Sequence, residues 1–240
     1  MSFWGLSSAE FAAIWAATGQ DRLPFPFRLS SDHEFADTFA AEQHALRSRF
    51  ARPEHALLEA AVLILAEPQW RIEVFGWHGG PPDVESDATP IRMIGAAARG
   101  HGVVALQHAG PSSEIGGDVA IRGCEPYDLA RQMVAQLPLV EAGMLHPVTA
   151  RRGAHADERR RRALVAALNR PASGSGVATV IRGPRHRPAT FGGIAWRDIA
   201  DDGRYLVYGS DSATVVPGDS WDLLAGLHRI TGHVDVGEAR

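Results

Sequence analysis

The sequence predicts an α+β fold in which a central twisted antiparallel β-sheet is flanked by helices. Four strand-like runs follow one another at residues 70–122, and four more follow at 177–216, each separated from the next by turn residues. A junction from a short apolar strand into a helix also occurs twice, as "DVAIRGCEPYDLARQMV" at 118–134 and "ATVVPGDSWDLLAGLHRI" at 213–230. Because each run of strands needs a layer that covers one face, we expect helices to pack on the sheet.

The N-terminal region is predicted to be mainly helical. Ser7 and Glu10 form a capping-box pattern that starts a helix over residues 8–18. The stretch 31–51 predicts a second helix, and Pro53 opens a third that runs to residue 66. Between the first two, apolar residues alternate in "LPFPFRL" at 23–29, which predicts an edge strand because proline cannot donate a hydrogen bond to a neighbour.

The two junctions predict an internal repeat. Aligning them at an offset of 94 residues pairs Tyr127 with Trp221 and Asp128 with Asp222. The result is a pseudo-twofold repeat of a helix/four-strand/helix unit, over approximately 53–138 and 156–231, inside a single domain of residues 1–240. The alternative is that any strand-to-helix junction favours these cap residues without a repeat.

Composition favours a soluble globular protein. Of the 240 residues, 45% are hydrophobic and 22% are charged, and the net charge of −4 excludes recruitment of a polyanion by bulk charge. The densest apolar run, at 60–66, is much shorter than the about 20 residues that a bilayer requires, and no signal-peptide pattern opens the chain, so we expect a cytoplasmic protein without membrane insertion. Cys124 is the one cysteine, which excludes an intramolecular disulfide and any multi-cysteine metal site.

Motifs for catalysis are lacking. The sequence has no G-x-S-x-G, Walker or G-x-G-x-x-G pattern, and its 11 histidines do not form H-E-x-x-H. We therefore predict a non-enzyme with no catalytic residue, no bound metal and no cofactor. One alternative is an enzyme with an unrecognised, hydrolase-like site, which would show a deep pocket holding a strongly perturbed carboxylate or histidine. Another is nucleic-acid binding through the basic run at 159–162, although adjacent acids favour a solvated helix flank.

A long hairpin loop is the most suggestive segment. The loop at 78–90, "HGGPPDVESDATP", carries three acidic residues without a counter-charge and is stiffened by two adjacent prolines. Loops of this length are either functional or simply solvated, and both readings stay open.

Several patterns resemble the EspG family, the cytosolic chaperones of mycobacterial and related actinobacterial type VII secretion (ESX) systems. They are "LSSAEFAAIW" leading into "LPFPFRLS", the "IRG" strand before an aromatic-Asp-Leu helix, and "DDGRYLVYGS" followed by "ATVVPGDSWDLLAGL". The resemblance implies a central antiparallel sheet with a quasi-twofold relation between its halves. It also implies binding of helical PE–PPE heterodimers, which such chaperones keep soluble and deliver to the secretion machine.

The resemblance implies a partner surface made from the sheet, the loop between the second and third strands and the C-terminal helices. An amphipathic helical partner with an exposed apolar tip would aggregate, and an apolar sheet surface could cover that tip reversibly. The client would be a PE/PPE-like protein rather than a nucleic acid, and self-association into a homo-oligomer stays open. The candidate partner-binding residues are Trp77, Pro82, Asp83, Val84, Glu85, Asp87, Ile91, Ile194 and Trp196.

Overall fold

The computed structural model describes residues 2–29, 36–80, 88–112, 114–151, 158–209 and 212–236. Five of the candidate residues, Pro82, Asp83, Val84, Glu85 and Asp87, lie outside these ranges. The chain divides into two compact units. Unit 1 comprises Met1–Glu73, Arg92–Met133 and Ile181–Thr190, and unit 2 comprises Val74–Ile91, Val134–Val180 and Phe191–Arg240.

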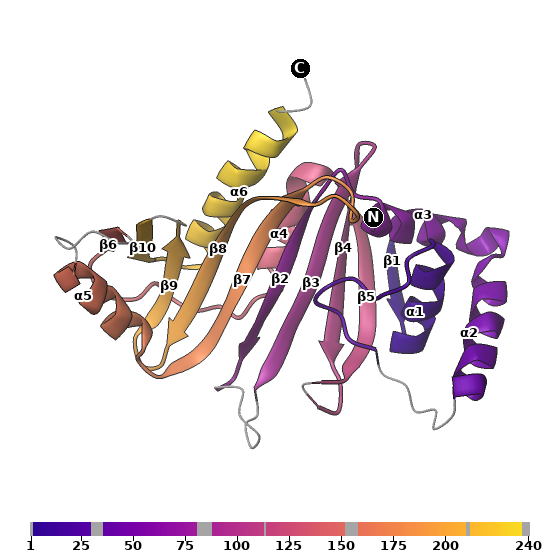
Figure 1. Ribbon diagram of the computed structural model, residues 1–240, viewed down its shortest axis with the longest axis horizontal. Helices are drawn as coiled ribbons and strands as arrows, with labels where there is room; N and C mark the ends of the chain where they lie inside the picture. Colours follow the sequence, from indigo (N-terminus) through magenta and orange to yellow (C-terminus); the bar gives the residue numbers. More distant parts are fainter. Residues whose placement is uncertain are drawn as a thin grey trace. The chain divides into compact units, whose positions relative to one another are not determined.

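The strands form a sheet in the order β1-β5-β4-β3-β2-β7-β8-β9-β10-β6, and the strand pairs with defined registers are antiparallel (Figure 1). The strands are β1 (Phe3–Leu6), β2 (Trp70–His78), β3 (Thr89–Ala98), β4 (His101–Ala109), β5 (Gly116–Cys124), β6 (Val148–Arg151), β7 (Ala172–Arg182), β8 (Ala189–Ile199), β9 (Gly203–Tyr208) and β10 (Ser212–Pro217). The helices are α1 (Ser8–Ala17), α2 (Ala36–Phe50), α3 (Ala56–Ala66), α4 (Leu129–Val134), α5 (Glu158–Leu168) and α6 (Ser220–Val236), with short 3-10 turns at Pro53–His55 and Pro126–Asp128.

Unit 1 packs helices on both faces of its strands. Residues at even positions of β3, such as Ile94 and Ala96, belong to a core shared with α1, α2 and α3, which gather beside β1 (Figure 1). Odd positions face α4, because a side chain at Gly95 would collide with the sulfur of Met133. Successive strand residues point to opposite faces, so one strand serves both helical layers.

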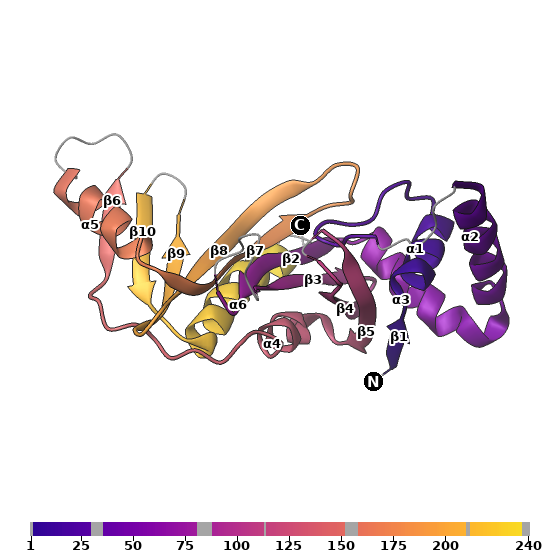
Figure 2. The same cartoon turned by 90° about the horizontal axis from the view of Figure 1, so that it is seen from below.

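Unit 2 uses the same alternation on β9. Tyr205 packs with Leu164 of α5, whereas Tyr208 lies against Gly226 of α6. Helix α6 therefore lies on one side of these strands, where it is drawn in yellow in Figure 2, and α5 packs on the other side near β6 and β10.

Local signals set most element boundaries as predicted. Ser7 and Glu10 form the capping box of α1, with Glu10 N donating to Ser7 Oγ at 3.1 Å and Ser7 N donating to Glu10 Oε2 at 2.9 Å. The eight strands expected at 70–122 and 177–216 are present as β2–β5 and β7–β10. The α+β class with a large antiparallel sheet and flanking helices is confirmed.

Two local predictions were wrong. Residues 23–29 are irregular, with a turn at 25–26 in which Phe27 N donates to the carbonyl of Pro24, and the edge beside β5 is taken by β1 instead. Two prolines in four residues leave that segment few donors for a ladder, which favours a turn. The first strand of the second set was expected to begin at residue 177, yet β7 begins at Ala172 and includes the stretch "ASGSG" at 172–176.

The element order helix, four strands, helix occurs twice, from α3 to α4 and from α5 to α6. The two compact units do not follow these segments along the chain. The single domain and the pseudo-twofold relation between two copies therefore stay predictions.

Candidate partner-binding face

Strands β7 and β8 of unit 2 have one buried face and one exposed face. Ala178 and Val180 on β7, and Ile194 and Trp196 on β8, are buried. The alternate positions carry Val177 and Phe191, which are exposed, and Phe75 on the neighbouring strand β2 is exposed as well. We call the surface formed by Phe75, Trp77, Val177 and Phe191 the open face.

Helix α6 closes the opposite face. A side chain at Gly226 of α6 would meet Ile194 and Tyr208, and one at Gly192 of β8 would meet Ile230 of α6. Small residues at these two positions let the helix approach the strands closely. On the open face Val177 and Phe191 are exposed, and α5 packs on the same face farther along, at Ile199 and Tyr205.

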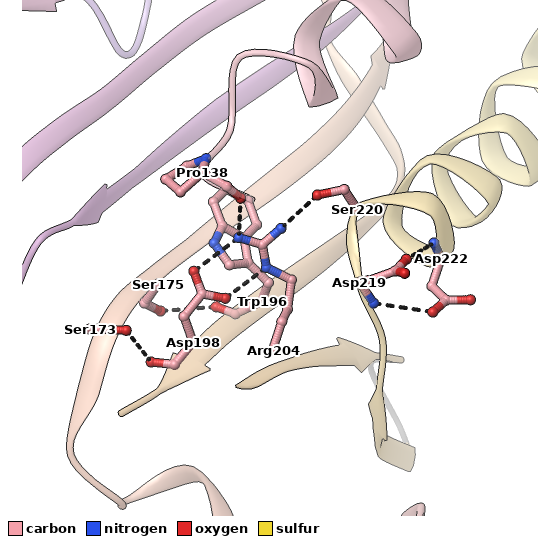
Figure 3. A network of polar contacts seen from close by, with 9 residues as sticks. All are labelled: Pro138, Ser173, Ser175, Trp196, Asp198, Arg204, Asp219, Ser220 and Asp222. Atoms are coloured by element: carbon pink, nitrogen blue, oxygen red, sulfur yellow. Dashed lines mark hydrogen bonds and ion pairs between the residues drawn. The ribbon is translucent and has the colours of Figure 1, made fainter. Parts of the chain in front are cut away.

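A buried ion pair lies under α6 (Figure 3). Arg204 of β9 is fully buried and sits directly across from Asp198 of β8, to which it donates two hydrogen bonds of 2.7 and 3.0 Å. The same guanidinium donates to the carbonyl of Pro138 at 3.1 Å and to Ser220 Oγ at 3.3 Å. One arginine thus fixes the start of α6 relative to the two strands that α6 covers.

The structure separates the described candidate residues. Trp77 is half-buried and shares the open face with Phe75, because the two lie two positions apart on one strand. It leads into the segment between β2 and β3, where Gly79 N and Gly80 N donate to the carbonyl of Ser173 at 2.8 and 3.2 Å. Ile91, Ile194 and Trp196 are all buried, so their side chains belong to the core and not to a surface that a partner could touch.

Sequence reasoning missed Phe75, Val177 and Phe191. The signal was present in "ASGSGVATVIR" and "ATFGGIAWRDI", where the residues at every second position could be assigned to one face. Which of the two faces is covered depends on where α6 packs. Helix α6 lies farther along the chain, so the local strand pattern does not predict which face it covers.

The described residues offer little to a catalytic interpretation. They contain no group of three or more His, Cys, Asp or Glu side chains that could hold a metal. Burial raises the pKa of the Cys124 thiol to about 11, with Asp128 and Glu125 adding to the shift, so the nucleophilic thiolate is scarce at neutral pH. Among the described residues, the pKa values of the Glu158 and Asp202 carboxyl groups are lowered by hydrogen bonds, first of all from Arg162 and from the Met144 amide respectively.

The basic run at 159–162 is partly neutralised. Glu158, at the first turn of α5, pairs with Arg161 at 2.8 Å and with Arg162 at 3.1 Å. These contacts fit a solvated helix flank, in which salt bridges three and four residues apart support the helix.

A family comparison covers nearly the whole chain. The sequence model of the EspG family matches residues 7–229. The chain belongs to the EspG family. A search of curated proteins found no match.

A solved structure shares the fold of this EspG family member. It is that of the Mycobacterium tuberculosis type VII secretion system chaperone EspG5 in complex with the PE25-PPE41 dimer. The TM-score is 0.66, the sequences are 12% identical, and the match covers 96% of each chain. The EspG fold is therefore retained from end to end although few residues are shared. The described part of the chain has no helix long and apolar enough to cross a bilayer.

Proposed function

We propose that this chain is a type VII secretion chaperone that binds a PE/PPE-like helical pair and keeps it soluble in the cytoplasm. The observation that carries the proposal is the open face of unit 2, a sheet surface with exposed apolar side chains on a fold that matches EspG5 over 96% of each chain. Membership of the EspG family supports the same function. The role needs no catalytic group, and we propose a non-enzymatic protein.

The physical argument starts from the cost of exposed apolar surface. Contiguous apolar patches on soluble proteins commonly mark interaction sites, because water exposure of such a patch is unfavourable. Phe75, Val177 and Phe191 are exposed on strands that are adjacent in the order β2-β7-β8, and we propose that they contribute to one interaction surface. A helical client with an exposed apolar tip has the complementary surface, and binding buries both.

We propose that the loop after β2 extends this surface. Trp77 belongs to the open face, and the acidic residues that follow it supply a polar rim around an apolar centre, which is the usual anatomy of an interface. The proposed contacts are Trp77 with Pro82, Asp83, Val84, Glu85 and Asp87 of the loop, together with Phe75, Val177 and Phe191. Ile194 and Trp196 would support the face from beneath.

Co-expression tests this proposal. The chain is produced together with the PE-like and PPE-like proteins encoded nearest to it, and the purified material is analysed by size-exclusion chromatography. We expect the three chains to co-elute and the pair to precipitate when this chain is omitted. A pair that is soluble alone and never co-elutes, with a screen of unrelated PE/PPE-like pairs also empty, would overturn the proposal.

A double variant tests the surface. We expect Phe75→Ser with Phe191→Ser to abolish co-elution while leaving the fold intact, as judged by circular dichroism. Leu57→Ser is the matched control, because Leu57 is a similarly apolar exposed residue of unit 1. Equal loss of binding in both variants would exclude the open face as the specific site.

A further inference from the structure

Strand β1 lies at one edge of the sheet, next to β5, and both strands belong to unit 1. The two strands are antiparallel, and Gly123 N donates to the carbonyl of Ser2 at 3.1 Å just before β1 begins. Hydrogen-bonded pairs recur at every second residue of an antiparallel ladder. The even residues of β1 therefore bond to β5, and the N–H and C=O groups of Phe3 and Gly5 point away from it. We call these outward groups the free edge.

The free edge is open to solvent. Gly5 is exposed, and because glycine has no side chain, the exposed surface is that of the main chain itself. A Cβ atom added at Gly5 would have nothing within 4 Å beyond its chain neighbours. Among the residues that the structure describes, none forms a hydrogen bond with the outward groups of Phe3 or Gly5. These donors and acceptors are thus free to bond to another main chain.

The strand lacks several features that commonly protect a sheet edge. Natural edge strands are often shielded by charged side chains, by proline or by a β-bulge, and "FWGL" contains neither a charge nor a proline. Its register with β5 is continuous from Phe3 to Leu6, without a bulge. An unpaired edge of this kind accepts an added strand, which is a recurring mode of peptide recognition. The free edge therefore indicates an extended main chain as its ligand.

One side of β1 faces helix α3. Trp4 packs against the core of unit 1 and lines a groove with the apolar side chains Leu57, Ala60 and Ile64 of that helix. Leu57 is 70% exposed. A residue of an added strand that lies opposite Trp4 would project on the same side of the sheet, beside this groove. An apolar side chain is therefore expected at that position of the ligand.

The other side of β1 offers space at Gly5. Residues of an added strand that bond to Phe3 and Gly5 would project on this side, and the open position at Gly5 leaves room for a large side chain. Phe3 is 62% exposed, and the guanidinium of Arg122 lies 5.8 Å from the centre of its ring. Arg122 on this side and Glu125 beside the groove have opposite charges. An uncharged ligand therefore fits the free edge best.

We propose that the free edge of β1 binds an uncharged, extended segment of a second protein, which joins the sheet as a further strand. The main-chain groups of Phe3 and Gly5 would hold it, and its alternate apolar side chains would lie beside Trp4 and Gly5. A complete second copy of the chain fits less well. Helix α2 lies beyond β1 on the side away from β5 (Figures 1 and 2), and a copy would bring its own α2 to the same place. The proposal does not rest on the chaperone function.

Two substitutions at one position test the free edge. Gly5→Pro removes an N–H that points outward and places the proline ring where the added strand would lie, while the bonds between β1 and β5 are kept. Gly5→Ala is the matched control, because it keeps the N–H and its methyl group enters open space. The probe is a peptide of about seven residues with blocked ends that alternates Thr with Val and Phe. A second peptide with proline at alternate positions is the negative control.

Isothermal titration calorimetry of the full chain should show binding of the alternating peptide and none of the proline peptide, which lacks the required donors. Gly5→Ala should bind within about twofold of the wild-type affinity, and Gly5→Pro should bind at least about tenfold more weakly. Thermal unfolding of both variants near the wild-type temperature excludes misfolding as the cause.

Amide hydrogen exchange measured by NMR gives a second readout on the unsubstituted chain. In the free protein, the N–H groups of Phe3 and Gly5 should exchange faster than those of Trp4 and Leu6, which bond to β5. The alternating peptide should slow the exchange of Phe3 and Gly5. This readout tests the proposal even if a substitution disturbs the fold.

Three results would overturn the proposal: no binding of the alternating peptide, equal affinity in the Gly5→Ala and Gly5→Pro variants, or slow exchange at Phe3 and Gly5 in the free protein. Slow exchange that becomes fast on dilution would assign the free edge to self-association instead. Gly5→Pro should still co-elute with the PE-like and PPE-like pair, and its loss from that complex would assign the free edge to the client. Failure of the pair to bind the wild-type chain would concern the chaperone function alone.

Discussion

The two faces of β7 and β8 in unit 2 are made from alternate residues of the same strands, and beside each face lie groups that are unusual for it. In an ordinary half-buried sheet the covered face is apolar and the solvent face is polar. Here the covered face holds the Asp198–Arg204 ion pair, and the open face presents Phe75 and Phe191. The ion pair of the covered face positions the start of α6, and the exposed aromatic residues of the open face fit the proposal that this face receives a client.

The comparison also separates two kinds of contribution. Residues of the covered face contribute to the stability of the free protein, since their partners lie within the chain. Exposed residues of the open face bury less surface within the chain and should contribute less to that stability. Substitutions on the covered face should therefore lower stability, and substitutions on the open face should leave stability unchanged.

The largest effect is expected from Arg204→Met. The substitution leaves Asp198 buried without its partner and frees the Pro138 carbonyl and Ser220 hydroxyl. Removing one member of a buried ion pair typically costs about 3–5 kcal/mol. Urea denaturation followed by circular dichroism should show a loss of that order.

A double variant sharpens this prediction. Arg204→Met with Asp198→Leu removes both charges, and replacing a buried pair by apolar residues of similar volume is often close to neutral. We expect the double variant to recover more than half of the loss. A single variant that costs less than about 1 kcal/mol would show that the covered face does not depend on the pair.

The next largest effect is expected from a substitution on the covered face, compared with one on the open face of the same strand. Ile194→Ala removes a fully buried side chain beneath α6 and should cost about 2–5 kcal/mol. Phe191→Ala, three residues earlier on the exposed face of the same strand, should change the free energy of unfolding by no more than about 0.5 kcal/mol. Denaturation of both variants in parallel checks this, and similar losses for the two would mean that the open face is covered in solution.

Much of this architecture could be predicted from local sequence. The capping box at Ser7, the Pro53 start and the turn residues between strands each act over a few residues, so their signals survive without tertiary information. The diffuse patterns near the C-terminus led to the EspG family, to which the chain belongs.

The errors have long-range causes. Glycine-rich "ASGSG" indicates flexibility when it is considered alone, but a side chain at Gly176 would overlap the indole of Trp196, and one at Gly174 would lie 2.8 Å from the Asp198 carboxylate. These glycines make room for large groups on the next strand. In the same way, Ile194 and Trp196 are buried on the face that α6 covers. Because α6 is distant in the sequence, local patterns did not distinguish these core residues from partner contacts.

The smallest effect on the free energy of unfolding is expected from substituting the cap residues of the two junctions that predicted an internal repeat. Asp219 caps α6, because its Oδ1 accepts from Trp221 N at 2.7 Å and from Asp222 N at 3.1 Å. Glu125, at the matching place before Pro126, makes no side-chain hydrogen bond to the helix that follows. Asp219→Ala should therefore cost about 1 kcal/mol in the free energy of unfolding, and Glu125→Ala should cost almost nothing.

Urea denaturation of the two alanine variants compares how much the cap residue of each junction contributes to the free energy of unfolding. The helix that needs its cap is α6, whose first turn carries Trp221 and whose packing closes the covered face. The short helix α4 is held instead by the burial of Leu129 and Met133, and Asp128 pairs with Arg131. Equal losses at both positions would mean that the two junctions are equivalent in energy as well as in sequence. The expected inequality would show that only the helix covering the ion pair depends on its N-terminal cap.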